Sequence, residues 1–323
     1  MSKTILLIDG DIVAFRSAAI AEERSIEVTH GPTGIKKSFK NRTEFKDAMK
    51  SKNKVITEDY SITDVQDAVS PAVCNHTIKN IINKFKNDVQ PDSVEIYVGG
   101  KNNFRDKLFL PSAYKGNRKD TIRPILLTDA KDYLKRSMGA KSIDGIETDD
   151  VLSYRGYEEL AKGNKPVVAT FDHDAQGHSG LWIYNFNEEN PVPKLIPSLG
   201  EIYSKNNDFH GTGLKMFAGQ WCCSDRSDCY KAYELSKVKF GPKKIIDLLA
   251  PLQTEKEVLE AVVKQFKTFY PEEFVYTAWD GSEHKADYKT MMDLYFKVSM
   301  MYRTKDDPLD YKAFLNSYGV QDD

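Results

Sequence analysis

Acidic residues recur where this chain leaves an apolar run or enters a predicted helix. The four groups are Asp9 and Asp11, then Glu147, Asp149 and Asp150, then Asp172 and Asp174, then Asp225 and Asp228. In open α/β sheets, ligands bind outside the carboxyl ends of the strands, where such side chains would meet. Carboxylates that meet repel one another unless cations lie between them. The pattern predicts a divalent-metal site, for Mg²⁺ or Mn²⁺, that acts on phosphodiesters.

Each acidic group also has a structural interpretation. Asp11 is placed to cap a helix that begins at Ile12, and Thr148 is a good N-cap for the helix that follows it. Acids in a first helical turn favour the helix dipole, and Asp172 and Asp174 fit a solvated turn. Capping explains one or two carboxylates, whereas three of the four residues from 147 to 150 are acidic.

Histidine and cysteine near these acids raise the question of zinc. His173 lies between Asp172 and Asp174, and residues 222–229 contain three cysteines. Structural zinc needs four ligands, mostly Cys and His, and the spacing here lacks the regular paired pattern. Buried free thiols and a surface or packing histidine are therefore the favoured interpretations.

Basic residues gather locally although the chain as a whole is slightly acidic. The 323 residues carry a net charge of −2, which excludes a globally basic nucleic-acid-binding protein. The loop predicted over residues 100–124 contains Tyr114, Lys115, Arg118 and Lys119, and a second basic stretch spans residues 231–244. Lysine and arginine there would steer phosphates, and Tyr114 would stack on a base or pack locally.

Composition indicates a soluble globular protein. Hydrophobic residues make up 40% of the chain and charged residues 29%. Because we find no apolar run of about 18 residues and no secretory signal, we expect no membrane partner and a cytoplasmic location. Four cysteines are too few for a disulfide scaffold.

Hydrophobic periodicity predicts strands that alternate with helices. The expected strands are 4–9, 94–98, 166–170 and 181–184, and the expected helices are 63–89, 126–138, 149–162, 213–221, 243–250, 254–268 and 286–302. Alternation of this kind predicts an α/β fold with a mostly parallel sheet flanked by helices. We expect a hairpin or other excursion over 24–56 and no strand after about residue 205.

Taken in order, these motifs resemble the 5′-nuclease superfamily of flap endonucleases and 5′→3′ exonucleases, and most closely the replication exonucleases of tailed bacteriophages. The motifs are Asp9-Gly10-Asp11, Tyr114-Lys115-Gly116-Asn117-Arg118, Glu147-x-Asp149-Asp150, Asp172-x-Asp174, Asp225-x-x-Asp228 and Phe240-Gly241-Pro242-Lys243-Lys244. The likeness spans residues 4–250. No one motif is specific, but their order and spacing are.

The resemblance implies a PIN-like catalytic domain over 1–205, with a helical arch at about 100–124, and a helical domain over 206–323 with a helix–hairpin–helix-like DNA clamp. It implies two metal ions, one held by Asp9, Glu147, Asp149 and Asp150 and the other by Asp172, Asp174, Asp225 and Asp228, with Asp11 as a further candidate ligand. Lys115 and Arg118 would contact the scissile phosphate. Tyr114, Lys119, Gly241, Lys243 and Lys244 would contact DNA.

The sequence departs from the family pattern at three places. The acid expected after the second strand is absent, because that region reads Tyr97-Val98-Gly99-Gly100. Ser224 and Cys229 replace the glycine and the asparagine that flank the last acid pair. The hairpin of the clamp keeps only one glycine, Gly241.

The resemblance implies two-metal hydrolysis of phosphodiesters at the 5′ ends of duplex, nicked or flapped DNA during phage replication. It extends the expected substrates to RNA primers in RNA–DNA hybrids. Other replication proteins are expected partners. One alternative is a protein on the same fold that binds branched DNA with little or no cleavage. The other is a phosphatase with Asp9 as nucleophile and Asp11 as acid and base, although the chain reads D-G-D-I where that chemistry expects D-x-D-G.

Overall fold

The computed structural model describes residues 2–119 and 121–322, in two compact units. Unit 1 comprises Met1–Asp9, Lys84–Thr121 and Gly139–Asp323, and unit 2 comprises Gly10–Asn83 and Ile122–Met138. The domain boundary predicted at residue 205 falls inside unit 1 and not between the two units. The functional division into a catalytic and a DNA-binding domain stays a prediction.

A six-stranded sheet forms the centre of unit 1, in the order β6–β5–β1–β7–β8–β9. The strands are β1 (Thr4–Asp9), β5 (Ser93–Gly99), β6 (Lys141–Ile143), β7 (Lys165–Ala169), β8 (Trp182–Tyr184) and β9 (Lys194–Leu195). All neighbours pair in parallel except β8 and β9. The apolar run of β1 is buried along most of its length, as a central parallel strand requires. The predicted α/β class with a mostly parallel sheet is confirmed.

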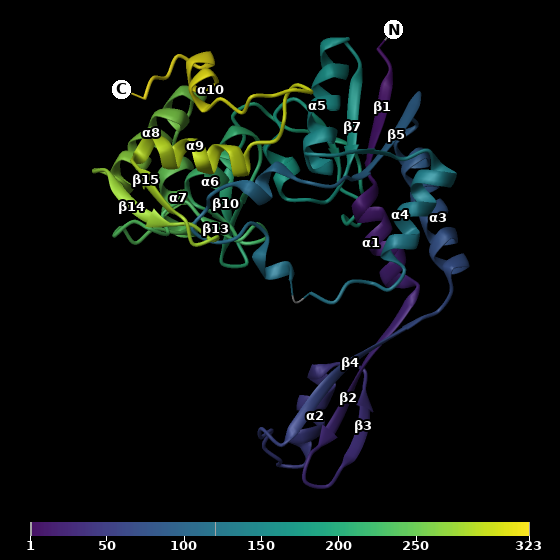
Figure 1. The fold of residues 1–323 in the computed structure, drawn as a ribbon. Helices are drawn as coiled ribbons and strands as arrows, with labels where there is room; N and C mark the ends of the chain where they lie inside the picture. The colour runs from purple at the N-terminus through teal and green to yellow at the C-terminus, as the bar shows by residue number, and fades with distance from the viewer. Residues whose placement is uncertain (1, 120, 323) are drawn as a thin grey trace. The chain divides into compact units, whose positions relative to one another are not determined.

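The sheet brings the carboxyl ends of β1 and β7 to one edge. Ile8 pairs with Ala169, so Asp9 and the residues that follow β7 leave the sheet side by side. Helix α5 (Thr148–Ala161) packs across β1, β5 and β7 (Figure 1). The first turn of α5 carries Asp149 and Asp150, so the sequence places a third acidic group on an element that contacts these strands.

The chain after residue 205 is mainly helical but contains short hairpins that we did not predict. The helices are α6 (Gly213–Cys222), α7 (Pro242–Leu249), α8 (Glu255–Phe269), α9 (Tyr288–Ser299) and α10 (Tyr311–Ser317). The hairpins pair β10 (Ile202–Lys205) with β11 (Asp208–Gly211), β12 (Ser224–Asp225) with β13 (Tyr230–Lys231), and β14 (Phe274–Thr277) with β15 (Glu283–Ala286). Strands of two to four residues are too short for an alternating pattern to predict.

Helix α6 forms the centre of this second cluster. Every residue from Gly213 to Cys222 is buried, so α6 lacks the polar face of a surface helix. Trp221 is fully buried, and its indole nitrogen donates a hydrogen bond to the Met292 carbonyl oxygen at 2.9 Å. The helix ends beside the acidic turn Ser224–Asp228, which is thereby anchored to the core.

Unit 2 contains α1 (Gly10–Ile20), α4 (Leu127–Met138) and a small antiparallel sheet in the order β3–β2–β4. Its strands are β2 (Glu22–His30), β3 (Ile35–Phe39) and β4 (Tyr60–Ala68), and α2 (Arg42–Ser51) lies against one face (Figure 1). The predicted excursion over 24–56 is this module. The predicted helix 63–89 was wrong at its start, because residues 63–68 pair with β2 and α3 spans only Pro71–Val89.

The loop expected to form a helical arch is folded differently in its described part. Residues 100–119 contain two 3₁₀ turns, Phe104–Lys107 and Gly116–Arg118, and no α-helix; residue 120 of the predicted arch lies outside the described residues. Arg105, Leu110 and Tyr114 are buried and hold this segment against the rest of unit 1. Because these three side chains point into the core, the segment packs as a loop and does not form helices that extend into solvent.

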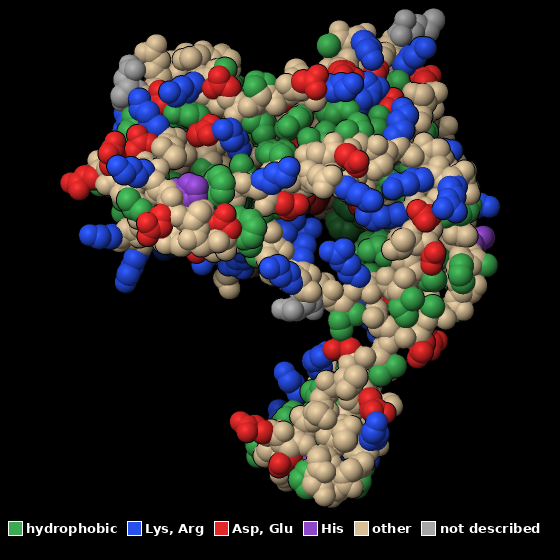
Figure 2. All heavy atoms as spheres, in the orientation of Figure 1, with side chains coloured by type: hydrophobic (Ala, Val, Ile, Leu, Met, Phe, Trp, Pro, Cys, Tyr) green, Lys and Arg blue, Asp and Glu red, His purple; other side chains and the backbone are tan. Residues whose placement is uncertain are grey.

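Charges of both signs are mixed over the face of the molecule shown in Figure 2, as the small net charge leads one to expect. Among the described residues, the helices are either too short or too polar to cross a lipid bilayer.

Candidate metal centre

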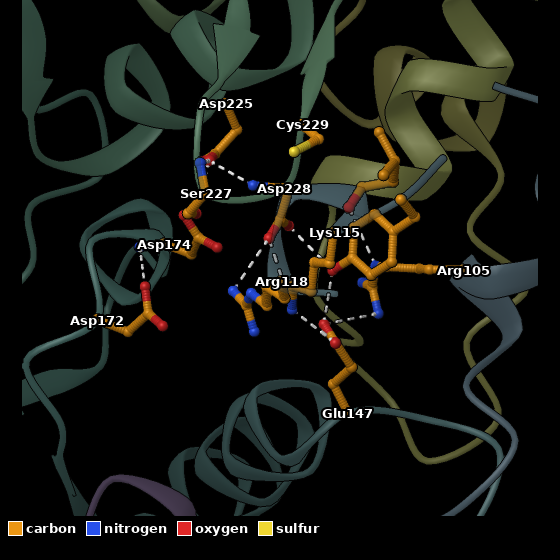
Figure 3. Close-up of polar contacts among 12 residues, drawn as sticks. Arg105, Lys115, Arg118, Glu147, Asp172, Asp174, Asp225, Ser227, Asp228 and Cys229 are labelled. Carbon is orange, nitrogen blue, oxygen red and sulfur yellow. Dashed lines mark hydrogen bonds and ion pairs between the residues drawn. The ribbon is translucent and has the colours of Figure 1, made fainter. Parts of the chain in front are cut away.

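Two strand ends and the loop after β7 supply the first carboxylates of the site. Asp9 is almost fully buried at 2% exposure and accepts a hydrogen bond from the Thr170 hydroxyl at 3.3 Å. Thr170 Oγ1 also accepts from the Asp172 amide at 3.1 Å, and Asp172 Oδ1 accepts from the Asp174 amide at 3.2 Å. These local bonds fix a turn that keeps Asp172 and Asp174 together (Figure 3).

Asp149 and Asp174 sit in environments that oppose their negative charge. Desolvation by the surrounding protein and the negative charges of Asp172 and Asp9 hold the pKa of Asp149 well above its usual range. Desolvation and the charges of Asp172, Asp225 and Asp228 do the same to the pKa of Asp174. Both side chains keep part of their surface open to solvent. Carboxylates from separate parts of the chain therefore influence one another's pKa values within unit 1, and their predicted role as metal ligands stays a prediction.

The turn after α6 brings in the last acid pair. Asp225 Oδ1 accepts hydrogen bonds from the amides of Ser227 at 2.7 Å and Asp228 at 3.1 Å, and together with the Ser227 hydroxyl these bonds lower the pKa of Asp225 against the effect of its burial. Burial raises the pKa of Asp228 to about 6 although Lys115 opposes that change. The surroundings thus stabilise the charged form of Asp228 less than that of Asp225. Asp225 is the residue whose hydrogen bonds shape the turn.

Gln220 joins two of these acids and was not predicted. Its amide nitrogen donates to Asp225 Oδ2 at 3.3 Å and also contacts Asp174. The residue is 4% exposed and lies on α6, within an apolar helix that gave no sign of a polar role. A neutral amide between two carboxylates fixes their orientation without neutralising them.

Tyr114 and Lys115 reach the cluster from the loop. Lys115 Nζ lies 2.6 Å from Glu147 Oε1 and 3.5 Å from Asp228 Oδ1, while Arg118 lies 3.7 Å from Asp228 (Figure 3). The Tyr114 hydroxyl lies within hydrogen-bonding distance of both Glu147 and Asp228, at 2.8 and 2.9 Å. Tyr114 is 8% exposed, so it follows the predicted alternative of local packing rather than base stacking.

Asp150 is occupied by a buried arginine, which corrects its predicted role as a metal ligand. Arg105 donates to both carboxylate oxygens of Asp150, at 2.6 and 2.9 Å, and both side chains are fully buried. Arg105 also donates to the carbonyl oxygens of Val298 and Met300, at 3.0 and 2.7 Å. Asp150 accepts from the Glu147 amide at 3.0 Å, so Glu147 rather than the predicted Thr148 caps α5.

Asp11 belongs to unit 2 and is a member of a different ion pair. It lies in the first turn of α1, where Lys131 Nζ of α4 is 2.7 Å from Asp11 Oδ1. Since α1 begins at Gly10, Asp11 is not the N-cap that the structural interpretation predicted. The two acids of the Asp9-Gly10-Asp11 motif therefore have different surroundings. Asp9 lies in the acidic cluster of unit 1, whereas Asp11 is bound to Lys131.

The thiols and histidines next to the cluster follow the structural interpretation. All four cysteines are free, and burial raises the pKa of Cys222 and Cys223, which keeps them as thiols. His173 Nε2 lies 2.9 Å from His210 Nδ1, and burial beside His210 lowers the pKa of His173. A hydrogen bond between the two rings fits a packing role.

The donor chemistry of the cluster fits hard divalent cations. Oxygen ligands from Asp and Glu are those that Mg²⁺ and Mn²⁺ take. Within the described part of the chain, no three Asp, Glu, His or Cys side chains converge closely enough to form a ready-made ion site. Glu147 pairs with Lys115, and Asp150 pairs with Arg105. Asp9, Asp149, Asp172 and Asp174 lie among other carboxylates, whereas Asp228 also lies near Lys115 and Arg118.

The missing acid after β5 has a local explanation. A Cβ atom built on Gly100 would lie 2.1 Å from the Ile143 carbonyl oxygen, so position 100 cannot carry a side chain without a backbone shift. The close approach of this segment to β6 therefore requires glycine.

A cleft of about 620 Å³ lies beside the cluster in unit 1. Its lining includes Asn117, Asp225, Arg226, Lys231 and Pro242. Pro242 starts α7, and Gly241 before it has a φ of 157°, a conformation that favours glycine. Lys243 and Lys244 are exposed in the first turn of α7. The cleft thus connects the acidic turn with a helix N-terminus, whose free amides and dipole favour anions.

The solved structures similar to this chain include 5′-nucleases. T5 5′-exonuclease with bound zinc ions is 12% identical, with 92% of this chain and 100% of that chain covered and a TM-score of 0.45. The flap endonuclease of bacteriophage T5, solved as a pseudo-enzyme–product complex with DNA and metal ions, is 11% identical, with coverage of 92% and 99% and a TM-score of 0.45. No family model and no curated protein matches the chain.

Proposed function

We propose that this protein is a metal-dependent 5′-nuclease that hydrolyses phosphodiesters at the 5′ ends of duplex, nicked or flapped DNA. The observation that carries the proposal is the gathering of Asp149, Asp174 and Asp228, three carboxylates with raised pKa values, on elements from distant parts of the chain. Burying such groups together is costly for a fold, and raised pKa values of this kind concentrate at functional sites.

Asp9, Asp149, Asp172, Asp174 and Asp228 would hold two Mg²⁺ or Mn²⁺ ions. Bound there, the ions would activate water and stabilise the leaving oxygen of an in-line displacement. Gln220 would keep Asp174 and Asp225 in fixed orientations through its contacts with both. Because no side chain has to form a covalent intermediate, the work of the protein is to position ligands and substrate.

Lys115 and Arg118 would bind the scissile phosphate. Lys115 Nζ contacts Glu147 and Asp228, and Arg118 is half exposed beside Asp228. Cations that bind Asp228 would weaken its hold on Lys115 and leave the ammonium group to the phosphate. Positive charge next to the reacting phosphate stabilises the charge that develops in the transition state.

The N-terminus of α7 would hold the duplex backbone. Exposed Lys243 and Lys244 flank a helix start whose free amides point outward, and Lys119 adds a further exposed charge in the loop. Such contacts carry no sequence information and position the substrate.

The digestion of end-labelled DNA tests the proposal. Duplex, nicked and 5′-flap substrates are incubated with Mg²⁺, with Mn²⁺ or with EDTA, and product lengths are read on a denaturing gel. We expect short products or released flaps from the 5′ end with either metal and none with EDTA. Substrate that stays intact under all these conditions would refute the proposed nuclease activity.

The pairing of two predicted ligands with cations favours one second function, a protein that binds branched DNA with little or no cleavage. Glu147 and Asp150 are both engaged by basic side chains, and Gly100 leaves no room for an additional acid. Under this function, the flap substrate shifts in a native gel yet stays intact with Mg²⁺ and Mn²⁺.

The Lys243→Ala/Lys244→Ala variant checks the α7 contact. We expect weaker binding of duplex DNA and a salt dependence whose slope is reduced by about 2, since each phosphate contact contributes about 1. Binding is measured by fluorescence anisotropy in EDTA at several salt concentrations. The Lys256→Ala/Lys264→Ala variant removes the same charge from exposed positions of α8 and serves as the control. An equal effect of both variants would contradict a specific contact.

A further inference from the structure

We propose that residues 22–68 of unit 2, called the inserted module below, bind a single-stranded nucleic acid segment in a pocket beside α2. The proposal rests on the proposed function in one respect, because it takes the strand to be part of a DNA substrate. It uses no residue of the acidic cluster.

The inserted module is built around a small core of its own. Ile26, Val28, Phe45 and Met49 are buried between α2 and the sheet. The register places His30 opposite Ile35 on one side and opposite Tyr60 on the other. Because side chains alternate along a strand, His30 and Tyr60 share the face that α2 covers. The buried core does not extend to the end of the sheet that carries His30 and Tyr60.

A pocket of about 280 Å³ opens where that core ends. His30, Phe39 and Tyr60 line it and are only partly buried. The His30 and Tyr60 rings lie 4.8 Å apart, and the Phe45 ring lies 5.8 Å from Tyr60. The volume is slightly below the range of about 300–1,000 Å³ for small-molecule sites, which suits a single planar ring. Aromatic side chains so arranged offer faces on which a base stacks.

Lysines surround this pocket. Lys37, Lys52 and Lys54 line it and are exposed, and none of the described lining residues carries a carboxylate. These three make no ion pair with a described residue, whereas Lys36 on the other face of the sheet pairs with Glu27. Positive charge without a partner beside aromatic rings attracts an anion that contains rings.

The basic stretch continues beyond the pocket, and this favours a strand over a small ligand. Residues 36–54 contain Lys36, Lys37, Lys40, Arg42, Lys46, Lys50, Lys52 and Lys54 but only two acids, Glu44 and Asp47. The inserted module as a whole has nine basic and nine acidic residues, so this excess is confined to the segment 36–54, which includes α2. A groove that follows a phosphate backbone, with rings for the bases, is the usual design for single strands.

The test measures binding of a labelled oligothymidylate of about 12 nucleotides by fluorescence anisotropy, with the full-length protein in EDTA. The pocket variant is Lys37→Glu/Lys52→Glu/Lys54→Glu. The control variant, Lys205→Glu/Lys256→Glu/Lys264→Glu, makes the same charge change at exposed positions of unit 1, outside the inserted module. A third variant, His30→Ala, removes a ring and leaves the buried core intact. Circular dichroism checks that each variant is folded.

We expect the pocket variant to bind at least tenfold more weakly, the His30→Ala variant about fivefold more weakly, and the control variant within threefold of the unchanged protein. Equal losses in the two charge variants would overturn the proposal in favour of general attraction. Tight binding of an acidic peptide with an aromatic residue, without binding of the oligonucleotide, would assign the pocket to a protein partner instead. Since EDTA prevents cleavage, an inactive nuclease that still binds through the pocket would overturn only the proposed function.

Discussion

The Asp149→Asn variant is expected to lose Mg²⁺-dependent cleavage of a 5′-flap substrate by about a thousandfold. Asp149 is held among Asp9, Asp172 and Glu147, and the substitution keeps its size while removing the charge that a cation would neutralise. A loss of about 4 kcal/mol of charge stabilisation corresponds to this factor, at about 1.4 kcal/mol for each tenfold change in rate. Initial rates from end-labelled substrate provide the measurement.

Binding and a matched substitution separate this effect from misfolding. The Asp149→Asn variant should bind the same flap substrate in EDTA at least as tightly as the unchanged protein, because it presents less negative charge to DNA. The Glu260→Gln variant removes an exposed carboxylate from α8 and should cleave at the normal rate. Cleavage by Asp149→Asn within threefold of normal would mean that Asp149 holds no ion.

The Arg105→Met variant is expected to destabilise unit 1 by about 3–5 kcal/mol. Arg105 and Asp150 are fully buried and joined by two hydrogen bonds, so removal of the guanidinium leaves a buried carboxylate without its partner. The free energy of unfolding is measured by urea denaturation. The loss should be far larger than the change of up to about 1 kcal/mol that an exposed pair gives.

Two further variants isolate the Arg105–Asp150 pair. The Arg105→Lys variant keeps the charge but loses the two-point contact, and it should fall between the unchanged protein and Arg105→Met. In the Arg105→Met/Asp150→Asn variant the uncompensated charge is gone, so we expect part of the lost stability to return. Additive losses in the double variant would contradict a direct coupling between the two side chains.

The sequence predicted those parts of the fold that have strong local patterns. The apolar runs of β1, β5 and β7 and the periodic faces of α4, α5 and α7 to α9 were found because each is long enough to repeat. Residues 63–68 of strand β4 were taken for the start of a helix because Val65 and Ala68 fit the helical spacing that continues into α3. The pairing of β4 with β2 decides its structure, and that pairing is not visible in either segment alone.

The candidate site was predicted as a set of acids but not as a set of roles. In the structure, Glu147 pairs with Lys115, Asp149 lies among other acids and Asp150 binds Arg105. The spacing of the three residues in the sequence gave no means to distinguish these roles. Arg105 and Gln220 were missed because Asp150 lies 45 residues from Arg105 and Asp174 lies 46 residues from Gln220. Distant pairing of this kind is a property of the folded chain, and local patterns carry no sign of it.

The raised pKa values also fix how stability should change with pH. A carboxyl group whose pKa is higher in the folded protein than in the unfolded chain binds its proton more tightly when folded. Its contribution to stability is therefore present at low pH and is lost as pH rises from the usual value near 4 through the folded value, about 6 for Asp228. Above pH 6 the cluster opposes folding unless cations neutralise it.

Thermal unfolding with and without Mg²⁺ at pH 7.5 tests this claim most directly. It uses the unchanged protein and Asp174→Asn, which keeps an oxygen for Gln220, at matched ionic strength. We expect Mg²⁺ to raise the Tm of the unchanged protein by at least about 3 °C, as a ligand well above its Kd does. In EDTA, Asp174→Asn should melt above the unchanged protein and gain little from Mg²⁺. An unchanged Tm on Mg²⁺ addition, together with a lower Tm for Asp174→Asn in EDTA, would contradict a cluster built to hold cations.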